Sequence, residues 1–393
     1  MLFNKRLGLF IHWGIYACKG WQEQELGRLG LTNNEYEPYM QQFNPQNYNP
    51  DDWIIKAKAA GMSYIVFTAK HHDGFCMWAT KETDYNIMNT PYRKDILKEL
   101  SEACIKHDFP LGIYYSNPDW HHIHAYNPLS SHQMPPLIDN PDFSRYKGFL
   151  RNQIIELMTE YNKIACLFWD IPPKLEDIEL MDMVRRLQPG ILINDRGWGA
   201  GDYSTPEREL PSCAPYKNNV EANQSVGHQS WGYRVNEDYY SASFLMKSIS
   251  GYLMRGANYL LNIGPDALGR FPEEADTLLA VIGKWYKNAK EALDSEWMPE
   301  LGVKGEFQVS KTGNSYYLHF DYPAERTGYA VPFLNEPPVS VVLLNDGRML
   351  KYEIERFPTR HIFYSGKIEP DCLHIMGIPC DSIHEPLKVK ISI

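Results

Sequence analysis

The feature that most constrains the fold of this chain is a repeated alternation of short apolar runs and longer amphipathic segments, from the N-terminus to about residue 297. The apolar runs are rich in β-branched and aromatic residues, as buried strands are. Strands that are followed by helices predict a parallel sheet, and this many repeats predict a (β/α)8-like barrel of the TIM type. The candidate strands are residues 8–12, 64–69, 111–116, 164–169, 190–194 and 259–263, and the candidate helices are residues 50–61, 95–108, 149–162 and 178–190.

Five of the candidate strands end in polar or ionisable side chains. The stretch YIVFTAKHHDG, residues 64–74, shows this most clearly, because an apolar strand runs directly into a lysine, two histidines and an aspartate. Enzymes with a barrel fold build their active sites at the carboxyl ends of the strands, so five such endings together predict an active site. The polar groups at these ends are His12, His71, Tyr115 with Ser116, Asp170, and Asp195 with Arg196.

The pattern changes after Trp297. Short strand candidates are separated there by Gly, Asn, Asp and Pro turn signals, with no helical period between them. We therefore expect two domains, a catalytic barrel over residues 1–297 and a C-terminal β-sandwich over residues 298–393. The strand candidates of the second domain are residues 306–310, 314–320, 340–345, 361–365 and 387–393.

Composition narrows the class of function. The formal net charge is −10 and the sequence has no cluster of Lys and Arg, which argues against a nucleic-acid-binding surface. No apolar stretch approaches the length of a membrane span. The 10 Trp and 26 Tyr would suit the stacking of sugar rings, but an aromatic core explains them at least as well.

The cysteines and the N-terminus bear on the compartment. The seven cysteines are scattered and include no CxxC pair, which is typical of reduced thiols and not of a disulfide framework. The stretch MLFNKRLGLFIHWG has too short an apolar run for a signal peptide and no small-residue cleavage site. We therefore expect a cytoplasmic protein, with a secretion signal already removed as the alternative.

Asp170 is the first candidate for chemistry. It follows the apolar run CLFW, and a buried carboxylate is costly unless it is hydrogen-bonded or reactive. The alternative is a helix cap, because DIPP places proline in the first turn of a following helix. The loop GDYSTPERE offers a second carboxylate in Asp202, Glu207 or Glu209. Two carboxyl groups at different strand ends are what glycoside hydrolysis requires.

The histidines allow three interpretations. His12, His71 and His72 could bind sugar hydroxyls, because an imidazole both donates and accepts hydrogen bonds. They could be satisfied core residues, or they could bind zinc with an aspartate. Adjacent residues on a strand point to opposite faces, so His71 and His72 are poor joint ligands unless the strand has ended. The stretch DWHHIHAY, residues 119–126, is the best sequence argument for a metal.

Five motifs together give the sequence a family resemblance. They are GLFIHWGIYA, FTAKHHDGFCMW, GIYYSNPDW, NDRGWGAGDYSTPE and GANYLLNIGPDALGRFP. In this order they resemble the motifs of the α-L-fucosidases of glycoside hydrolase family 29, from about residue 7 to residue 285. The resemblance implies a retaining, exo-acting enzyme that hydrolyses terminal α-L-fucosides of oligosaccharides or glycoconjugates through a covalent intermediate. It implies a barrel followed by a β-sandwich, and neither a cofactor nor a metal.

The resemblance also assigns roles by motif. Asp170 is implied as the nucleophile and Glu207 as the general acid and base. We choose Tyr115 rather than Tyr114 as the sugar-binding tyrosine of YYS, and we expect Trp231, with Trp198 and Phe10 as alternatives, to form an apolar wall for the 6-methyl group. The expected sugar-binding residues are His12, Glu23, His71, His72, Tyr115, Arg196 and Trp231.

The sequence departs from the family pattern at two positions near the site. Many members have a Glu-Trp pair after the first strand, whereas Glu23 is followed here by Gln24, which leaves the role of Glu23 open. The nucleophile motif usually continues into glycine, whereas Ile171 follows Asp170. Two alternatives therefore stay beside a fucosidase: a related glycosidase with shifted sugar specificity, and a catalytically silent fucose-binding protein. A homo-oligomer is compatible with the sequence.

Overall fold

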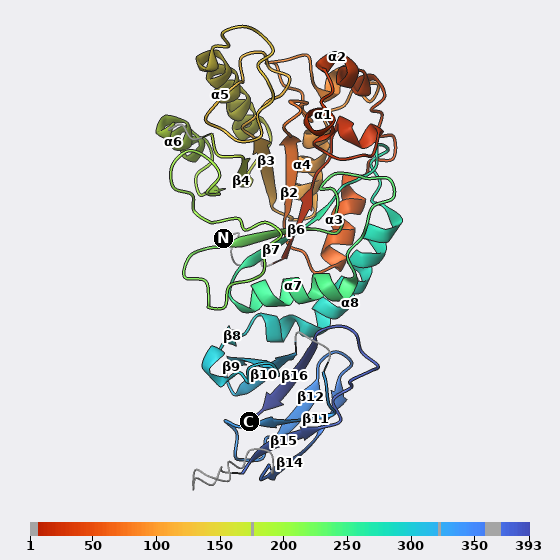
Figure 1. Cartoon of the computed structure of the whole chain (residues 1–393), viewed down its shortest axis with the longest axis vertical. Coiled ribbons are helices and arrows are strands. Elements are labelled where there is room, and N and C mark those ends of the chain that lie inside the picture. Colours follow the sequence, from red (N-terminus) through yellow and green to blue (C-terminus); the bar gives the residue numbers. More distant parts are fainter. Residues whose placement is uncertain (1–6, 174–176, 321–323, 358–370) are drawn as a thin grey trace. The chain divides into compact units, whose positions relative to one another are not determined.

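The computed structural model describes residues 7–173, 177–320, 324–357 and 371–393, and these form two compact units (Figure 1). The first unit consists of the described residues within Met1–Glu209, Lys217–Tyr240 and Ala257–Ala280. The second consists of those within Leu210–Tyr216, Ser241–Gly256 and Val281–Ile393. The second unit thus includes stretches that precede residue 297, and the domain boundary expected there stays a prediction.

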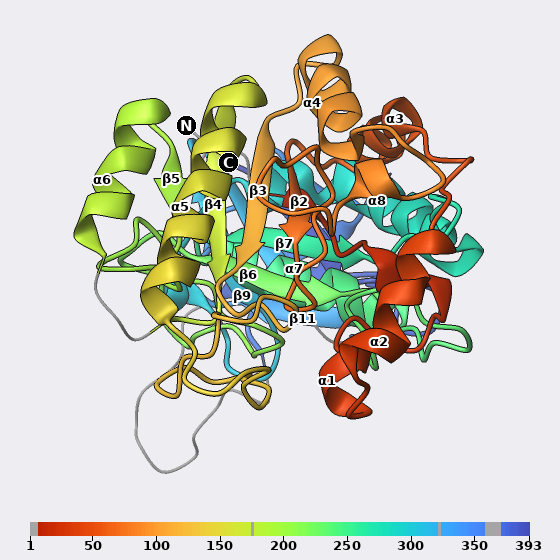
Figure 2. The same ribbon diagram turned by 90° about the horizontal axis from the view of Figure 1, so that it is seen from above.

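A seven-stranded sheet, in which all neighbouring strands are parallel, forms the centre of the first unit (Figure 2). The strand order is β5-β4-β3-β2-β1-β7-β6, so each of β1 to β4 lies beside the next strand along the chain. The expected barrel-type alternation of strand and helix is confirmed. The strands are β1 (Leu7–Ile11), β2 (Ile65–Lys70), β3 (Leu111–Ser116), β4 (Ile164–Asp170), β5 (Leu192–Ile193), β6 (Glu221–Ser225) and β7 (Asn258–Ile263).

An irregular segment, residues 203–207, connects the two edges of this sheet. Its first residue forms a parallel bridge with Asn194, directly after β5, and its last residue, Glu207, forms one with Asn223 of β6. The barrel is therefore closed by a segment that is too irregular to count as a strand. This closing segment carries one of the two acidic side chains of the predicted site.

Strand β6 was not predicted, because its sequence, EANQS, contains no apolar run. All five of its residues are nevertheless buried. Buried polar groups need hydrogen-bond partners, and Oε2 of Glu221 accepts one from the hydroxyl of Tyr64 at 2.6 Å. Strand β6 belongs to the sheet because its backbone pairs with that of β7. The polarity of its side chains does not reveal this pairing.

The helices of the first unit begin where polar caps allow. Each of α3 to α6 is preceded by an Asn or Asp whose side chain accepts a hydrogen bond from a backbone N–H of the first turn. The four helices lie around the strands in Figure 2. The helices of the described residues are α1 (Glu25–Arg28), α2 (Asn33–Tyr36), α3 (Pro50–Ala59), α4 (Ile96–Lys106), α5 (Phe143–Glu160), α6 (Ile178–Leu187), α7 (Ala242–Met254) and α8 (Glu273–Leu293), with 3-10 turns at Ile15–Cys18, Glu37–Gln41, Ile87–Asn89 and Pro299–Leu301.

A cluster of large side chains fills the interior of the barrel, which is therefore a packed core and not a pore. The ring of Tyr64 occupies the space where Gly8 has no side chain, and a Cβ at Gly8 would collide with that ring. Tyr114, Phe10 and Phe168 belong to the same cluster and also reach the carboxyl ends of their strands. The core thus forms the floor of the site described below.

Two antiparallel sheets form most of the second unit. The larger has the order β13-β12-β16-β10-β9-β8 and the smaller the order β11-β15-β14. Residues of both sheets, such as Val341 and Ile375, belong to one apolar cluster, so the sheets pack face to face as the expected sandwich. The expected strand at 361–365 lies outside the described residues. The strands are β8 (Glu296–Trp297), β9 (Gln308–Thr312), β10 (Ser315–Phe320), β11 (Gly328–Val331), β12 (Ser340–Leu343), β13 (Arg348–Met349), β14 (Lys351–Glu355), β15 (Cys372–Met376) and β16 (Leu387–Ser392).

Candidate active site

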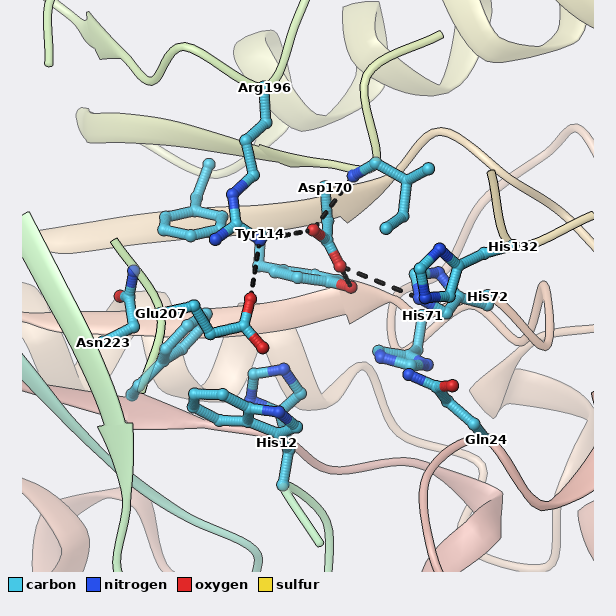
Figure 3. A pocket seen from close by; sticks show the side chains of 14 residues that line it. His12, Gln24, His71, His72, Tyr114, His132, Asp170, Arg196, Glu207 and Asn223 are labelled. Carbon is cyan, nitrogen blue, oxygen red and sulfur yellow. Dashed lines mark hydrogen bonds and ion pairs between the residues drawn. The ribbon is translucent and has the colours of Figure 1, made fainter. Parts of the chain in front are cut away.

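A pocket of about 130 Å³ lies at the carboxyl ends of the barrel strands (Figure 3). Side chains reach it from the ends of β1, β2, β3 and β4 and from the segments that follow β4 and β5. This is the edge of the sheet at which the sequence predicts an active site. The lining residues are Phe10, His12, Gln24, His71, His72, Tyr114, His132, Phe168, Asp170, Ile171, Arg196, Glu207, Asn223 and Trp231.

Asp170 is the last residue of β4, and its carboxylate is held from several sides. Oδ1 accepts hydrogen bonds from Nη1 of Arg196 and from the backbone N–H of Ile171, both at 2.9 Å. Oδ2 accepts one from the hydroxyl of Tyr114 at 2.7 Å and lies 3.8 Å from Nε2 of His72. Burial raises the pKa of Asp170, but these partners, Arg196 first, lower the pKa more, and it lies below its ordinary value. The carboxylate is therefore ionised at neutral pH.

One nitrogen of Arg196 joins the two acidic side chains of the pocket. Nη1 of Arg196 lies 2.9 Å from Oδ1 of Asp170 and 3.0 Å from Oε2 of Glu207, as the dashed lines in Figure 3 show. Since both distances run from the same atom, the two oxygens lie no more than 5.9 Å apart. The side chain of Glu207 is 41% exposed, so it stands at the mouth of the pocket, whereas that of Asp170 is 12% exposed.

The structure contradicts two alternatives: Asp170 as a helix cap and Asp202 as the second carboxylate of the site. Helix α6 begins at Ile178 and is capped by Asp177, so Asp170 does not cap it. Asp202 accepts a hydrogen bond from the backbone N–H of Ile193 at 2.8 Å and pairs with Arg185 at 3.1 Å. Asp202 therefore fastens the loop to β5 and does not line the pocket.

Three imidazoles that follow β1 and β2 face the pocket together. Nδ1 of His12 lies 2.7 Å from Oδ1 of Asn262, and Nδ1 of His72 lies 2.7 Å from Oγ of Ser116. The ring centres of His71 and His72 are 4.1 Å apart. Burial lowers the pKa of His12 and of His72 to about 4 and holds the pKa of His71 well below its ordinary value. At pH 7 all three are neutral, and each offers one donor and one acceptor.

The geometry of the histidines bears on the metal interpretation. His71 and His72 lie beyond the end of β2, so the alternation of a strand does not separate them. In the part of the chain that the structure describes, no group of three or more His, Cys, Asp or Glu side chains is arranged to hold a metal ion. In the stretch 119–126, Nε2 of His121 lies 2.9 Å from Oε1 of Glu37 and its ring stacks on Tyr85.

The tyrosine in the pocket is Tyr114, and the choice of Tyr115 is wrong. The hydroxyl of Tyr115 donates to Oε1 of Gln153 at 2.6 Å, and its ring lies under Nζ of Lys70 at 4.4 Å from the ring centre. Successive side chains of a strand point to opposite faces, so only one of the two tyrosines of β3 reaches the pocket. The hydrogen bond from Tyr114 to Asp170 shows which one it is.

Glu23 lies behind the pocket lining, and its neighbour Gln24 lines the pocket. Oε2 of Glu23 accepts three hydrogen bonds, from the hydroxyl of Ser230 at 2.7 Å and from the backbone N–H groups of Trp231 at 2.9 Å and Gly232 at 3.1 Å. This carboxylate therefore holds the backbone that presents the Trp231 ring. Oε1 of Glu23 is buried without a hydrogen-bond partner among the described residues.

The apolar lining comes from three aromatic rings. Phe10, Phe168 and Trp231 line the pocket, and the ring centres of Phe10 and Phe168 are 5.2 Å apart. The guanidinium of Arg208 lies over the Trp231 ring at 4.6 Å from its centre. Trp198 does not line the pocket, and its ring packs instead against that of Trp169, with ring centres 4.9 Å apart.

Several lining residues were not predicted. His132 comes from the long connection between β3 and α5, and its ring centre lies 5.7 Å from that of His72. Asn223 lies on the unpredicted strand β6. Phe168 and Ile171 flank Asp170 on either side and could have been inferred from the β4 pattern, whereas no local signal places His132 or Asn223 in the site.

Comparison with known proteins agrees with this geometry. The family model of α-L-fucosidases matches residues 3–291. Rat tissue α-L-fucosidase is 26% identical over 327 residues, which cover 73% of this chain and 68% of that protein.

Solved structures agree over nearly the whole chain. α-L-Fucosidase isoenzyme 1 from Paenibacillus thiaminolyticus is 30% identical, with a TM-score of 0.83 over 100% of this chain and 97% of its own. A family 29 α-L-fucosidase from Bacteroides thetaiotaomicron, trapped as a covalent intermediate with 2-fluoro-fucosyl fluoride, is 25% identical, with a TM-score of 0.75 over 98% of this chain and 94% of its own. The family match spans most of the chain and includes every residue that lines the pocket. The chain therefore belongs to the α-L-fucosidase family of glycoside hydrolases.

Proposed function

We propose that this protein is a retaining, exo-acting α-L-fucosidase, with Asp170 as the nucleophile and Glu207 as the general acid and base. The observation that carries the proposal is the bridge through Arg196, which limits the distance between the two carboxyl oxygens to 5.9 Å. Retaining glycosidases hold their carboxyl groups about 5–5.5 Å apart, whereas inverting enzymes need about 6.5–9.5 Å to admit a water molecule. The separation here supports direct attack on the sugar.

The first step forms the covalent intermediate. A carboxylate oxygen of Asp170 attacks the anomeric carbon of fucose, and the bond from that carbon to the glycosidic oxygen breaks. Glu207 gives its proton to the departing oxygen, so the released glycan leaves as an alcohol. The low pKa of Asp170, which Arg196 and its other partners maintain against burial, keeps the attacking group ionised.

The second step releases fucose. Glu207, now ionised, takes a proton from water, the water oxygen bonds to the anomeric carbon, and the ester bond to Asp170 breaks. Two successive displacements restore the original anomeric configuration.

The remaining lining suits one deoxy-sugar ring. Nδ1 of His12 and Nδ1 of His72 donate to Asn262 and Ser116, so the Nε2 atoms of these neutral rings can accept hydrogen bonds from sugar hydroxyls. The neutral ring of His71 adds one donor and one acceptor. Trp231, Phe10 and Phe168 supply apolar surface for the 6-methyl group. The small volume of the pocket supports exo action, because it suits one terminal sugar and not a glycan that continues at both ends.

Related structures add support from outside this chain. The trapped intermediate of the Bacteroides enzyme is covalent, as the proposed mechanism requires. Another relative, AlfC, has a structure in complex with Fuca(1,6)GlcNAc and is 29% identical with a TM-score of 0.66. Fucosylated oligosaccharides or glycoconjugates are therefore the substrates that we propose for this protein.

The test is hydrolysis of an aryl α-L-fucoside by the wild-type protein and by Asp170→Ala, with and without azide. We expect wild-type activity, a loss of several orders of magnitude in the variant, and azide rescue that yields a fucosyl azide of inverted configuration. Absence of wild-type activity would contradict the proposal. Azide rescue of Asp170→Ala that yields a product without inversion would contradict only the role of Asp170 as the nucleophile, and not the fucosidase activity.

A second candidate, a glycosidase for another sugar, rests on Gln24. The side-chain amide of Gln24 lines the pocket. Many members of the family have a tryptophan at this position of the Glu-Trp motif, and the amide could bind a hydroxyl that fucose lacks. A panel of aryl glycosides that differ from fucose at one carbon would distinguish the two. Binding of fucose without turnover would instead favour a silent binding protein, against which the presence of both Asp170 and Glu207 argues.

The compartment stays a prediction. In the described part of the chain, none of the seven cysteines is in a disulfide, which suits a reducing compartment such as the cytoplasm. No helix among the described residues is long and apolar enough to cross a membrane. Cell fractionation with an antibody to the native protein would test the expectation.

A further inference from the structure

The residue after Asp170 has an unusual backbone. Ile171 has a φ of 57°, in the left-handed region that β-branched residues rarely adopt. Such conformations persist only where the surrounding structure imposes them, and they concentrate at functional sites. Ile171 lies at the exit of β4 and lines the pocket, so the conformation belongs to the site itself.

The backbone N–H of Ile171 belongs to the peptide group that it shares with Asp170, and it points at the Asp170 carboxylate. This N–H donates to Oδ1 of Asp170 at 2.9 Å, on the same oxygen that accepts from Arg196. Oδ2 accepts from Tyr114. With a donor fixed by the backbone on one oxygen and a tyrosine on the other, rotation of the carboxylate about its Cβ–Cγ bond is restricted.

Asn117 holds the turn in place. It follows β3 and is buried, and its Nδ2 lies 3.0 Å from the carbonyl oxygen of Asp170 and 2.9 Å from that of Ile171. Its backbone N–H also donates to the carbonyl oxygen of Asp170 at 3.0 Å. Asn117 is itself fixed, because its carbonyl oxygen accepts a hydrogen bond from Tyr146 at 2.6 Å. One side chain thus contacts both carbonyl groups that flank the strained residue.

We propose that Asn117 and Ile171 are positioning residues for Asp170: Asn117 holds the carbonyl groups on both sides of the left-handed Ile171 and so fixes the Asp170–Ile171 peptide group, and the N–H of that peptide group then holds the carboxylate for attack. The inference rests on the proposed function, because it assigns a purpose to the orientation of the nucleophile. A purely structural role for Asn117 would stabilise the loop after β3 without affecting how residue 171 responds to substitution.

The experiment is a double-mutant cycle with Asn117→Ala and Ile171→Gly. Glycine adopts positive φ without strain, so a glycine at position 171 needs the clamp less than isoleucine does. With Ile171 present, Asn117→Ala should let the turn relax and weaken the hydrogen bond from the Ile171 N–H to the Asp170 carboxylate. We therefore expect kcat/KM for an aryl α-L-fucoside to fall about 10- to 100-fold, the range for a hydrogen bond to a charged group. With glycine at position 171, the same substitution should lower kcat/KM less than about 5-fold. The acid limb of the pH profile should move to higher pH in Asn117→Ala, because the relaxed turn no longer holds the Ile171 N–H against the Asp170 carboxylate.

Asn127→Ala is the matched control. Nδ2 of Asn127 donates to the carbonyl oxygen of Pro173 at 2.8 Å, so this buried asparagine holds the same segment without contacting Asp170 or Ile171. We expect its kcat/KM and pH profile to match the wild type. Equal losses from Asn117→Ala in both backgrounds at position 171, or an Asn117→Ala profile equal to that of Asn127→Ala, would overturn the proposal.

Thermal unfolding separates this inference from the proposed function. Ile171→Gly should raise Tm in the wild-type background by relieving strain, and should raise it less in Asn117→Ala, where isoleucine has already relaxed. This readout needs no substrate. Inactivity on every fucoside would defeat the proposed function and leave the coupling measurable, whereas additive Tm changes would defeat the positioning role in an active enzyme.

Discussion

The hydroxyl of Tyr114 donates a 2.7 Å hydrogen bond to Oδ2 of Asp170, while Tyr115, the next residue, points away and donates to Gln153. The two tyrosines are adjacent in sequence and lie on opposite faces of β3. Only Tyr114 contributes to the ionisation and the orientation of Asp170. This difference makes the pair a natural comparison of a site residue with its neighbour.

Tyr114→Phe should lower kcat/KM for aryl α-L-fucosides about 10- to 100-fold, because a hydrogen bond to a charged group is lost. Tyr114 is one of the groups that, after Arg196 and His72, lower the pKa of Asp170 against burial. Without it the pKa of Asp170 rises, so the acid limb of the pH profile should move to higher pH. The measurement is kcat/KM as a function of pH, with Tyr115→Phe as the control whose limb should not move. A shift in the control and none in Tyr114→Phe would reverse the assignment.

Glu207→Ala should separate substrates by the quality of their leaving group. A natural oligosaccharide needs a proton on the departing oxygen, so kcat/KM should fall about 10²- to 10⁴-fold. An activated aryl fucoside leaves without that proton, and its first step should change little. The measurement is the steady-state kcat/KM of Glu207→Ala on both substrates. Glu209→Ala is the control, and its rates should match those of the wild type. Full activity of Glu207→Ala on oligosaccharides would move the acid role to another residue.

Glu23→Gln should weaken substrate binding more than it slows the chemistry. In the wild type all three hydrogen bonds from Ser230, Trp231 and Gly232 end on one carboxylate oxygen, and the amide oxygen of glutamine is a weaker acceptor than a carboxylate oxygen, so the Trp231 wall should be held less firmly. We expect KM for an aryl fucoside to rise about 10-fold and kcat to fall less. Glu25→Gln is the control, since the Glu25 carboxylate accepts from Tyr39 and does not line the pocket. An unchanged KM in Glu23→Gln would disprove the link.

Glu221→Gln should change how stability depends on pH. Burial raises the pKa of Glu221 to about 7, despite the hydrogen bond from Tyr64 that lowers it. The folded state therefore holds a proton that the unfolded state has lost, and this stabilisation is present at low pH and disappears as the pH rises through about 7. Between pH 5.5 and 8.5 the wild type should lose about 2 kcal/mol more unfolding free energy than the variant, which does not titrate.

Urea denaturation of both proteins at the two pH values measures this difference. Glu221 lies on β6 and does not line the pocket, so the kcat/KM of the variant should equal that of the wild type. Parallel pH dependences of the two proteins would contradict a raised pKa of Glu221 in the fold.

Local sequence patterns were sufficient for most of the first unit. Apolar runs with β-branched and aromatic residues predicted β1 to β4 and β7 within one residue at each end, because their burial requires those side chains. Amphipathic spacing predicted α3 to α6, although α5 begins at Phe143 and not at residue 149, and it did not predict α7 or α8. The same patterns did not reveal β6, whose polar residues are satisfied by partners such as Tyr64 that are distant in sequence.

The sequence by itself determined the family, the class of fold and the two acidic candidates, because motif order and strand endings are properties of the chain. Tertiary structure decided which tyrosine faces the pocket, that Glu23 supports Trp231 from behind, and that one nitrogen of Arg196 joins Asp170 to Glu207. These facts depend on which face each side chain takes and on distances between strand ends. Such distances arise only when the sheet closes and brings residues far apart in sequence to one edge.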